Sequence, residues 1–276
     1  MSPASTAPRF RRLLPAPLDA EGAESADIDL AAAYAFPAGL DRPWVRANMV
    51  ASADGGAWGP SGRTKELSSP ADRAVMGVLR GLADVVLAGA GTARIEGYRP
   101  IRPRPAWQEL RAGRPAAPPM AVVTRTLDLQ PGLLAEPPGG ARTIVLTTES
   151  APAERRAAAA EHAEVLVVGD DAVRAEAVVA ALAERGLFRV LTEGGPHLLA
   201  ELSSAGLTDE LCLTLSPRLV GPASGRIVAG GSPSHPQDLR LDHVLESGGS
   251  LFLRYVRAPE PEAGRDRIRP PEVTPR

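Results

Sequence analysis

The sequence predicts an α/β domain built on one mixed, mostly parallel sheet. Short apolar runs alternate with helical segments from residue 44 to residue 205, which is the pattern of parallel βαβ units. The pattern then changes, because Leu211, Leu213 and Leu215 alternate with Cys212 and Thr214. Such period-two alternation is typical of antiparallel strands. We therefore expect antiparallel C-terminal strands after the parallel ones, with ligands bound at the carboxyl ends of the parallel strands.

Each expected element has its own signal in the chain. Ser69 and Pro70 form an N-cap followed by proline at the first helical position, and apolar residues then recur on one face as far as Leu82. Residues 84–88 form a continuous apolar run, which is typical of a strand covered on both faces. The remaining expected strands are residues 44–51, 121–124, 143–147, 165–168, 188–192, 239–246 and 251–257. The remaining expected helices are residues 27–35, 153–161, 173–185 and 197–205, and Gly248 and Gly249 mark a hairpin turn.

Composition divides the chain of 276 residues into three parts. We expect an N-terminal arm over residues 1–41, irregular over residues 1–25, and one domain over residues 42–258. Residues 259–276 carry five prolines among charged residues, so we expect a disordered tail. The hydrophobic fraction of 44% is large enough for a substantial core in the central part.

Charge and cysteine content exclude several classes of function. A net charge of −2 argues against nucleic acid or an anionic membrane surface as the main partner. The single cysteine, Cys212, rules out an internal disulfide framework and a cysteine-cluster metal site, and we expect no metal. The chain has neither an apolar run long enough to span a membrane nor a secretory signal, so we expect a cytoplasmic protein.

Two glycine turns follow apolar strands and are candidates for phosphate binding. Glu193-Gly194-Gly195-Pro196 lies between a strand and a helix, and Gly89-Ala90-Gly91-Thr92 ends the strand over residues 84–88. Glycines let backbone N–H groups approach a ligand closely, and a helix N-terminus adds free donors and partial positive charge. Each turn alone could be an ordinary strand–helix connection, but one extended ligand could bridge the two.

Two further strand ends carry polar groups with two interpretations each. Thr124 and Arg125 could bind a phosphate monoester, such as the 2′-phosphate of NADPH, or could lie in a solvated loop. Asp54, in the turn after the first strand, could orient or protonate a nitrogen heterocycle, or could simply stabilise the turn.

The ordered set of motifs is more specific than any one of them. Ser52-x-Asp54-Gly55, Leu79-Arg80-x-x-Ala83-Asp84, Gly89-x-Gly91-Thr92, Glu193-Gly194-Gly195-Pro196 and Asp209-Glu210-Leu211 occur in one order. In this the chain resembles the reductase domain of the bifunctional riboflavin-biosynthesis deaminase/reductase, over roughly residues 42–257, and most of all the stand-alone actinobacterial members. No zinc deaminase domain is expected, because its cysteine pair cannot form with one cysteine.

The resemblance implies a dihydrofolate-reductase-like fold of three layers, an NADPH cofactor, and hydride transfer to an imine-like ribosyl carbon of a phosphoribosylaminouracil. It also implies a homodimer joined through the C-terminal strands. It assigns catalytic roles to Asp54 and Glu193, and substrate contacts to Asn48, Ser52, Thr64, Arg80 and Glu193. The cofactor positions that it implies are Val50, Ala51, Gly89, Gly91, Thr92, Thr124, Arg125, Gly194, Gly195, Pro196, His197 and Leu198.

Several segments depart from the family pattern and leave alternatives open. Asn48 stands where the family often has lysine, and the segments Glu66-Leu67-Ser68 and Glu96-Gly97-Tyr98 replace family motifs that handle the substrate. Arg99, Arg102 and Arg104 could bind the substrate phosphate instead, or could be solvated charges. A reductase of dihydrofolate or another pterin, and a non-catalytic NADPH-binding protein, therefore remain alternatives.

Overall fold

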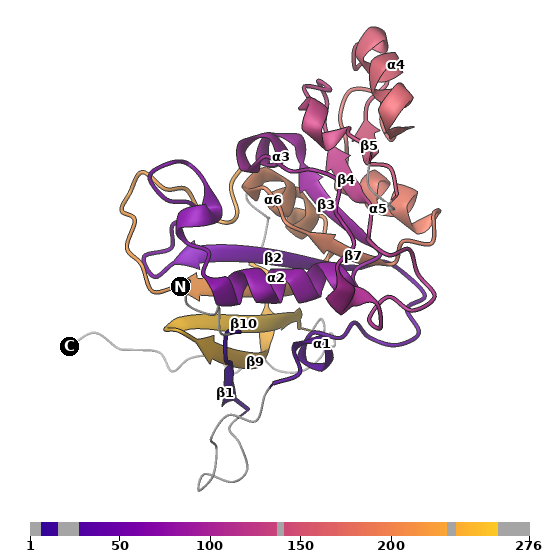
Figure 1. Ribbon diagram of the computed structural model, residues 1–276. Helices are drawn as coiled ribbons and strands as arrows, with labels where there is room; N and C mark the ends of the chain where they lie inside the picture. Colours follow the sequence, from indigo (N-terminus) through magenta and orange to yellow (C-terminus); the bar gives the residue numbers. More distant parts are fainter. Residues whose placement is uncertain (1–6, 16–27, 137–140, 231–235, 259–276) are drawn as a thin grey trace, which may run out of the picture.

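A ten-stranded mixed sheet forms the centre of the molecule (Figure 1). The computed structural model describes residues 7–15, 28–136, 141–230 and 236–258. The sheet order is β1-β9-β10-β8-β2-β7-β3-β4-β5-β6. The strands are β1 (Arg11–Leu14), β2 (Trp44–Ser52), β3 (Val85–Gly89), β4 (Met120–Val123), β5 (Ile144–Thr147), β6 (Glu164–Val167), β7 (Arg189–Thr192), β8 (Thr208–Ser216), β9 (Leu239–Ser247) and β10 (Ser250–Arg257).

The predicted fold class is confirmed by the strand pairing. All pairs from β8 through β2 and β7 to β6 are parallel, whereas β8 with β10, β10 with β9, and β9 with β1 are antiparallel. The helices are α1 (Leu30–Ala33), α2 (Pro70–Leu82), α3 (Ala90–Glu96), α4 (Ala153–His162), α5 (Ala175–Ala183) and α6 (Pro196–Ser204). In the part of the chain that the structure describes, none of these is both long and apolar enough to cross a membrane.

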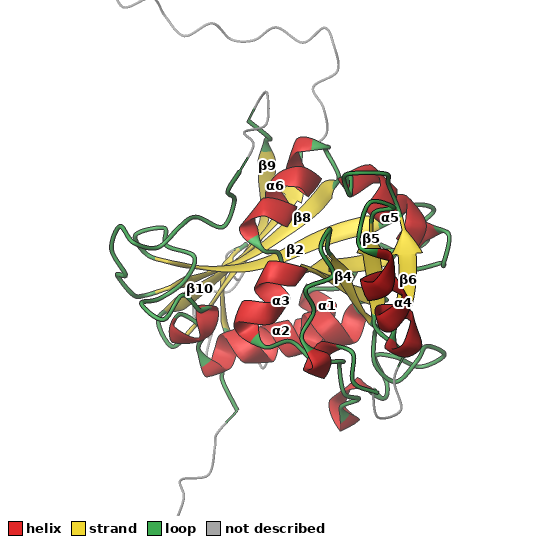
Figure 2. Cartoon of the chain, turned by 90° about the horizontal axis from the view of Figure 1, so that it is seen from above, coloured by secondary structure: helices red, strands yellow, loops and turns green. Residues whose placement is uncertain are grey.

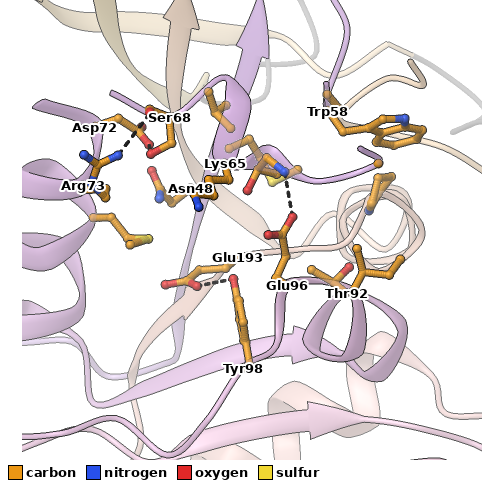
Figure 3. Close-up of a pocket in the computed structure, with 18 of the residues that line it drawn as sticks. Asn48, Trp58, Lys65, Ser68, Asp72, Arg73, Thr92, Glu96, Tyr98 and Glu193 are labelled. Carbon is orange, nitrogen blue, oxygen red and sulfur yellow. Dashed lines mark hydrogen bonds between the residues drawn. The ribbon is translucent and has the colours of Figure 1, made fainter. Parts of the chain in front are cut away.

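Helices cover both faces of the parallel half, which gives the three expected layers (Figure 2). Along β3, Val86 and Ala88 pack with α2 on one face, while Val85 and Leu87 pack with α5 and α6 on the other. Because side chains alternate along a strand, a continuous apolar run fills both cores at once. The carboxyl ends of β2 and β7, together with α2 and α3, border the pocket drawn in Figure 3.

The N-terminal arm differs from its prediction. Residues 11–14 were expected to be irregular, but they form β1 and pair antiparallel with β9 at the edge of the sheet. Phe10, just before β1, is buried and packs edge-on against Phe252 of β10, with ring centroids 5.3 Å apart. Burial of this ring gives the arm a fixed position that the proline-rich composition around it does not predict. The expected tail, residues 259–276, lies outside the described residues.

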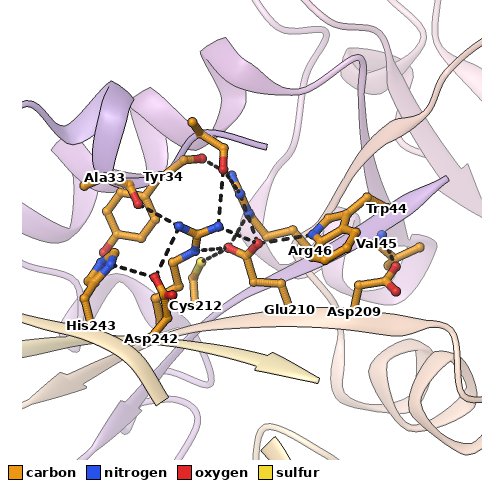
Figure 4. Close-up of polar contacts among 12 residues, drawn as sticks. Ala33, Tyr34, Trp44, Val45, Arg46, Asp209, Glu210, Cys212, Asp242 and His243 are labelled. Atoms are coloured by element: carbon orange, nitrogen blue, oxygen red, sulfur yellow. Dashed lines mark hydrogen bonds and ion pairs between the residues drawn. The ribbon is translucent and has the colours of Figure 1, made fainter. Parts of the chain in front are cut away.

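A buried charge network joins the two halves of the sheet (Figure 4). Arg46 of β2 is fully buried and lies 2.7 Å from the carboxylate of Glu210 on the neighbouring β8. Arg254 of β10 donates to the same carboxylate at 2.9 Å and to the carbonyl of Ala33 in α1. Arg46 also donates to the carbonyl of Tyr34, so both guanidinium groups fix the segment after α1 to the sheet.

Glu210 stays ionised within this network. Burial alone raises the pKa of its carboxyl, but the charge of Arg46 and the hydrogen bonds from Arg254 outweigh burial, so the pKa lies below its ordinary value. A buried carboxylate held by two guanidinium groups is costly to break, because removing one partner leaves an uncompensated buried charge.

Glu210→Gln therefore tests the network. We expect the variant to lose about 3–5 kcal/mol of unfolding free energy at pH 7 in urea titrations. Because the folded pKa is depressed, the stabilisation is complete above the ordinary carboxyl pKa of about 4.3 and is lost as the pH falls through the lower, folded value. Asp128→Asn, which removes the charge of an exposed partner of Arg94, should have the same free energy of unfolding as the wild type. Equal free energies of unfolding for Glu210→Gln and the wild type at pH 7 would contradict this interpretation.

Candidate active site

A pocket of about 320 Å³ opens where the carboxyl ends of the central parallel strands meet α2 and α3 (Figure 3). Its floor comes from β2 through Asn48, Met49 and Val50. Its other walls come from α2, α3, the residue after β7 and the loop before α2. These walls are formed by Ala57, Trp58, Gly62, Thr64, Lys65, Ser68, Asp72, Arg73, Met76, Arg80, Thr92, Ile95, Glu96, Tyr98, Glu193 and Pro196.

The two predicted glycine turns touch each other beside this pocket. The N–H of Gly89 donates to the carbonyl of Gly194 at 2.7 Å. A Cβ atom on Gly195 would lie 2.2 Å from Oγ1 of Thr92, so only glycine fits there without displacing Thr92. A Cβ atom on Gly91, by contrast, would meet no protein atom within 4 Å. The turns therefore pack on each other at one point and leave open space at another.

Two helices begin beside this open space without a side-chain cap. Helices α3 and α6 begin directly after the two turns, and neither N-cap, Gly89 or Gly195, has a side chain that could accept from the first turn. The first N–H groups of a helix have no partner within it, and α6 begins with a proline that has no N–H to satisfy. Two helix N-termini at adjacent strand ends, with their partial positive charge, suit a phosphate group.

Glu193 forms the most tightly bonded polar group of the pocket. Arg80 of α2 donates to its two carboxylate oxygens through Nε and Nη2, both at 2.6 Å, and the hydroxyl of Tyr98 donates to Oε2 at 2.6 Å. The Arg80 guanidinium also lies over the Tyr98 ring, 5.6 Å from its centroid. Figure 3 shows Tyr98 rising from the segment after α3 to meet Glu193.

The protonation state of Glu193 follows from these bonds. Burial on its own raises the pKa of the carboxyl, but the Arg80 charge and the hydrogen bonds from Arg80 and Tyr98 outweigh burial and hold the pKa below its ordinary value. The group is thus a carboxylate at neutral pH and accepts hydrogen bonds. Its direct effect is to fix the Arg80 guanidinium at the pocket wall.

The loop before α2 closes the remaining side of the pocket. The N–H of Thr64 donates to Glu96 of α3 at 2.8 Å, and the hydroxyl of Ser68 donates to Asp72 of α2 at 2.6 Å. Lys65 lies between these two contacts and lines the pocket. These bonds engage both carboxylates, so the loop is tied to α2 and α3 by its own backbone and hydroxyl groups.

Comparison with known proteins identifies the family. The RibD C-terminal domain family matches residues 43–253. The chain belongs to this family. The resemblance inferred from the motifs is thereby confirmed, and so is the expected oxidoreductase class, since this is a reductase family whose members typically use NADH or NADPH.

Relatives and solved structures align with about four fifths of this chain. The 2,5-diamino-6-ribosylamino-4(3H)-pyrimidinone 5′-phosphate reductase of Archaeoglobus fulgidus is 29% identical over 219 residues, which cover 78% of this chain and 100% of the relative. The crystal structure of a pyrimidine reductase-like protein from Corynebacterium diphtheriae has a TM-score of 0.71 and 26% identity, and covers 79% of this chain and 93% of that one. The bifunctional deaminase/reductase from Thermotoga maritima shares the fold, with a TM-score of 0.59 at 22% identity over 79% of this chain and 57% of that one.

Most residues that the sequence assigned to the RibD-type site lie at or beside the pocket. Asn48, Val50, Thr64, Arg80, Thr92, Glu193 and Pro196 line it, and Gly89, Gly91, Gly194 and Gly195 form the adjoining turns. Ala51 and Leu198 are buried next to these residues in β2 and α6, and His197 is exposed at the start of α6. Thr124 is buried at the end of β4, where its hydroxyl accepts from Leu127 N–H at 3.0 Å, and the following Arg125 is exposed.

Asp54 and Ser52 do not line the pocket. Ser52 is buried and donates to Asp54 at 2.5 Å, and Asp54 accepts from the N–H of Gly221 at 2.8 Å and of Val220 at 3.2 Å. The hydrogen bond from Ser52, followed by that from Gly221, lowers the pKa of the Asp54 carboxyl, so this group is also ionised at neutral pH. In this geometry the carboxylate ties the turn after β2 to the segment that follows β8.

Sequence reasoning did not assign three pocket residues that the structure brings together. Tyr98 and Glu96 were noted only as departures from the family pattern, and Lys65, the single lysine of the chain, was given no role. The arginines suggested for the substrate phosphate lie elsewhere: Arg104 stacks over Trp107 at 5.1 Å, and neither Arg99 nor Arg102 lines the pocket. Within the described ranges, no group of three or more His, Cys, Asp or Glu side chains is arranged to hold a metal ion.

Proposed function

We propose that this protein is an NADPH-dependent reductase of the riboflavin-biosynthesis type, acting on 5-amino-6-(5-phosphoribosylamino)uracil or its diamino analogue. The observation that carries the proposal is the contact between the two glycine turns directly beside a pocket that contains the Arg80–Glu193 pair. Membership of the RibD C-terminal domain family and the name of the Archaeoglobus relative support the same substrate class.

The residues present fit NADPH. The open space over Gly91 lets a pyrophosphate approach the backbone of α3, and the first turn of α6 offers donors on the other side. Arg125 follows β4, the strand next to β3, where it could bind the 2′-phosphate with the Thr124 hydroxyl. Val50 and Ala51 of β2 would then pack near the nicotinamide, and Gly194 to Leu198 would lie along the pyrophosphate.

When bound, NADPH would supply the hydride for the imine-like ribosyl carbon of the substrate. The protein contributes position and an environment that excludes water. Arg80, fixed bidentately by Glu193, presents a rigid donor to a pyrimidine carbonyl, and Thr64 and Asn48 supply further polar contacts. Met49, Val50, Met76 and Ile95 provide apolar walls. In this proposal Glu193 acts by positioning Arg80, and Asp54 acts by holding the turn after β2.

The coenzyme assignment can be tested at Arg125. Arg125→Ala removes one charge-assisted hydrogen bond to phosphate, about 1.5–3 kcal/mol, so the dissociation constant for NADPH should rise about 10- to 100-fold. The dissociation constant for NADH should not change, because NADH has no 2′-phosphate. Arg102→Ala, an exposed arginine outside the pocket, should leave both constants unchanged. Equal weakening of NADPH and NADH by Arg125→Ala would remove this assignment.

The charges of the pocket indicate where the substrate phosphate binds. Its wall carries the cations Lys65, Arg73 and Arg80 and the carboxylates Asp72, Glu96 and Glu193. The charge of Arg80 is balanced by Glu193, and each carboxylate already accepts a hydrogen bond. Neither Lys65 nor Arg73 has a carboxylate within 4.0 Å among the described residues, and Arg73 donates only to the carbonyl of Ser68, at 3.2 Å. We therefore assign the phosphate to Lys65 and Arg73 instead of the arginines after Tyr98.

Lys65→Met tests this assignment, because it removes the charge while keeping most of the length of the unbranched side chain. The KM for the phosphorylated pyrimidine should rise about tenfold or more, and the KM for the same pyrimidine without its phosphate should stay constant. Lys65→Arg should keep most of the affinity, and Arg63→Met, at an exposed neighbour outside the pocket, should behave as the wild type.

The same assay separates the alternative functions. Equal effects of Lys65→Met on both pyrimidines would contradict the phosphate assignment. Faster NADPH oxidation with dihydrofolate than with either pyrimidine would favour the pterin reductase. Binding of NADPH without turnover of any of these substrates would favour the non-catalytic protein.

The outer face of β8 and β10 fits a second copy of this chain. Leu211, Leu213 and Leu215 of β8 are half-exposed and stand opposite Tyr255, Leu253 and Leu251 of β10, which are half-exposed as well. Paired residues of adjacent antiparallel strands point to the same face, so these side chains form one apolar surface. An apolar surface of this kind on a sheet is typical of an interface, and the C-terminal strands are where the homodimer is expected.

Leu213→Glu tests the homodimer by sedimentation velocity. The wild type should sediment with twice the chain mass of 28.8 kDa, and Leu213→Glu should sediment as one chain, because a charge would be buried between the two copies. Leu219→Glu changes a leucine that is 81% exposed and outside this surface, and should sediment as the wild type. A wild-type protein with the mass of one chain would contradict the homodimer.

A further inference from the structure

A second hollow lies at the amino ends of the parallel strands, opposite the active site. It has a volume of about 540 Å³ and is bordered by the starts of the parallel strands, at Asp84 before β3, Pro119 before β4, Ile144 of β5 and Leu187 before β7. The active site lies at the carboxyl ends of the same group of strands, so the length of these strands separates the two sites. A volume of this size is in the range of small-molecule sites, about 300–1,000 Å³.

Basic groups outnumber acidic groups in the wall of this hollow. The wall contains four arginines, Arg111, Arg114, Arg142 and Arg185, but only two carboxylates, Asp84 and Glu164. Both carboxylates are already paired, because Asp84 lies 3.2 Å from Arg114 and Glu164 lies 2.7 Å from Arg185. Arg189, just outside the hollow, shares Asp84 at 3.7 Å. The wall therefore carries a surplus of positive charge.

Arg111 carries a large part of this surplus in a buried position. It is only 3% exposed and bonds to backbone carbonyls alone, through Nε to Pro115 at 2.6 Å and through Nη1 to Gly81 and Ala83. No acceptor for its Nη2 and no carboxylate partner exist among residues 7–15, 28–136, 141–230 and 236–258. Burial, followed by the charge of Arg114, lowers the pKa of Arg111 to about 10, and the charge of Asp84 offsets only part of this.

The carbonyls at the end of α2 explain only part of this arrangement. Arg111 and Arg114 bond to the carbonyls of Gly81, Leu82 and Ala83, so they cap α2, and the helix dipole there favours cations. A helix C-terminus carries about half a negative charge, which is less than one guanidinium. Arg142 takes no part in this cap, since its Nη2 donates to the carbonyl of Glu161 instead. Among the described residues, neither Arg111 nor Arg142 has a carboxylate within 4.0 Å, and both line the hollow.

We propose that this hollow is a second binding site, for a small organic phosphate, with the phosphate held by Arg111 and Arg142. A guanidinium presents a fork of donors that matches phosphate oxygens, which makes arginine the preferred partner of phosphate in partly buried sites. Pro115, Pro119, Ile144 and Leu187 supply apolar contacts for the organic part of the ligand. Binding there would supply a counter-ion to Arg111 and would be independent of catalysis at the carboxyl ends of the strands.

Calorimetric titration with inorganic pyrophosphate tests the site, because this probe carries the recognised group and nothing else. The wild type should bind pyrophosphate, and Arg142→Ala and Arg111→Lys should each weaken binding about tenfold or more, the latter by losing the fork of donors while keeping the charge. Arg125→Ala, which alters the proposed coenzyme site, should leave pyrophosphate binding at this hollow unchanged. Arg142 is exposed, so Arg142→Ala gives an answer even where Arg111→Lys fails to fold.

The remaining outcomes overturn the proposal. They are a wild type that binds no pyrophosphate, a variant Arg142→Ala that binds as tightly as the wild type, and binding that is lost only in Arg125→Ala. The last result would place the anion beside Arg125, at the position proposed for the 2′-phosphate.

Discussion

The hydrogen bond from Gly89 to Gly194 is the constraint on which the site depends. It joins the carboxyl ends of β3 and β7, two neighbouring parallel strands that are far apart in the sequence. Because β3 ends in glycine and two glycines follow shortly after β7, the two chain segments approach closely, and α3 and α6 begin side by side. A side chain at Gly195 would occupy the position of Thr92 and separate them. Two helix N-termini and a pocket floor on β2 then follow from the strand order alone.

Buried ion pairs serve two different purposes in this protein. Arg46, Glu210 and Arg254 lie away from the pocket and join β2, β8, β10 and the segment after α1, so they set how the antiparallel half meets the parallel half. Arg80 and Glu193 have a similar bidentate geometry, but they line the pocket, where a ligand can reach the guanidinium. The same chemistry therefore gives specificity of packing in one place and a rigid hydrogen-bond donor in the other.

The sequence predicts the sheet well because its signals are local. The continuous apolar runs at β3 and β7 and the alternation in β8 depend only on which faces of a strand are covered. It predicts α3 poorly, since Gly91 and Thr92 are weak helix formers and the helix has only seven residues. β1 was missed because its partner, β9, lies more than two hundred residues away in the sequence.

The sequence located the two glycine turns beside the pocket, but it did not locate the polar contacts in the pocket wall. Glycine at a strand end has a local backbone consequence, so those positions could be identified without the fold. Tyr98 gains its role only through Glu193, and Lys65 only because nearby carboxylates bond elsewhere, and neither relation is visible in the sequence. Asp54 is a different case: the motif marked it, but its carboxylate does not line the pocket and accepts hydrogen bonds from the segment after β8.

Affinity for NADPH in the wild type and in Gly91→Ala tests the central claim most directly. A Cβ at Gly91 meets no protein atom within 4 Å, and alanine favours a helix over glycine, so the variant should melt at or above the wild-type temperature. If the coenzyme lies against this backbone, the wild type binds NADPH, and the dissociation constant of the variant is at least about tenfold higher. A wild type that does not bind NADPH, or a folded Gly91→Ala variant with unchanged affinity, would contradict the account.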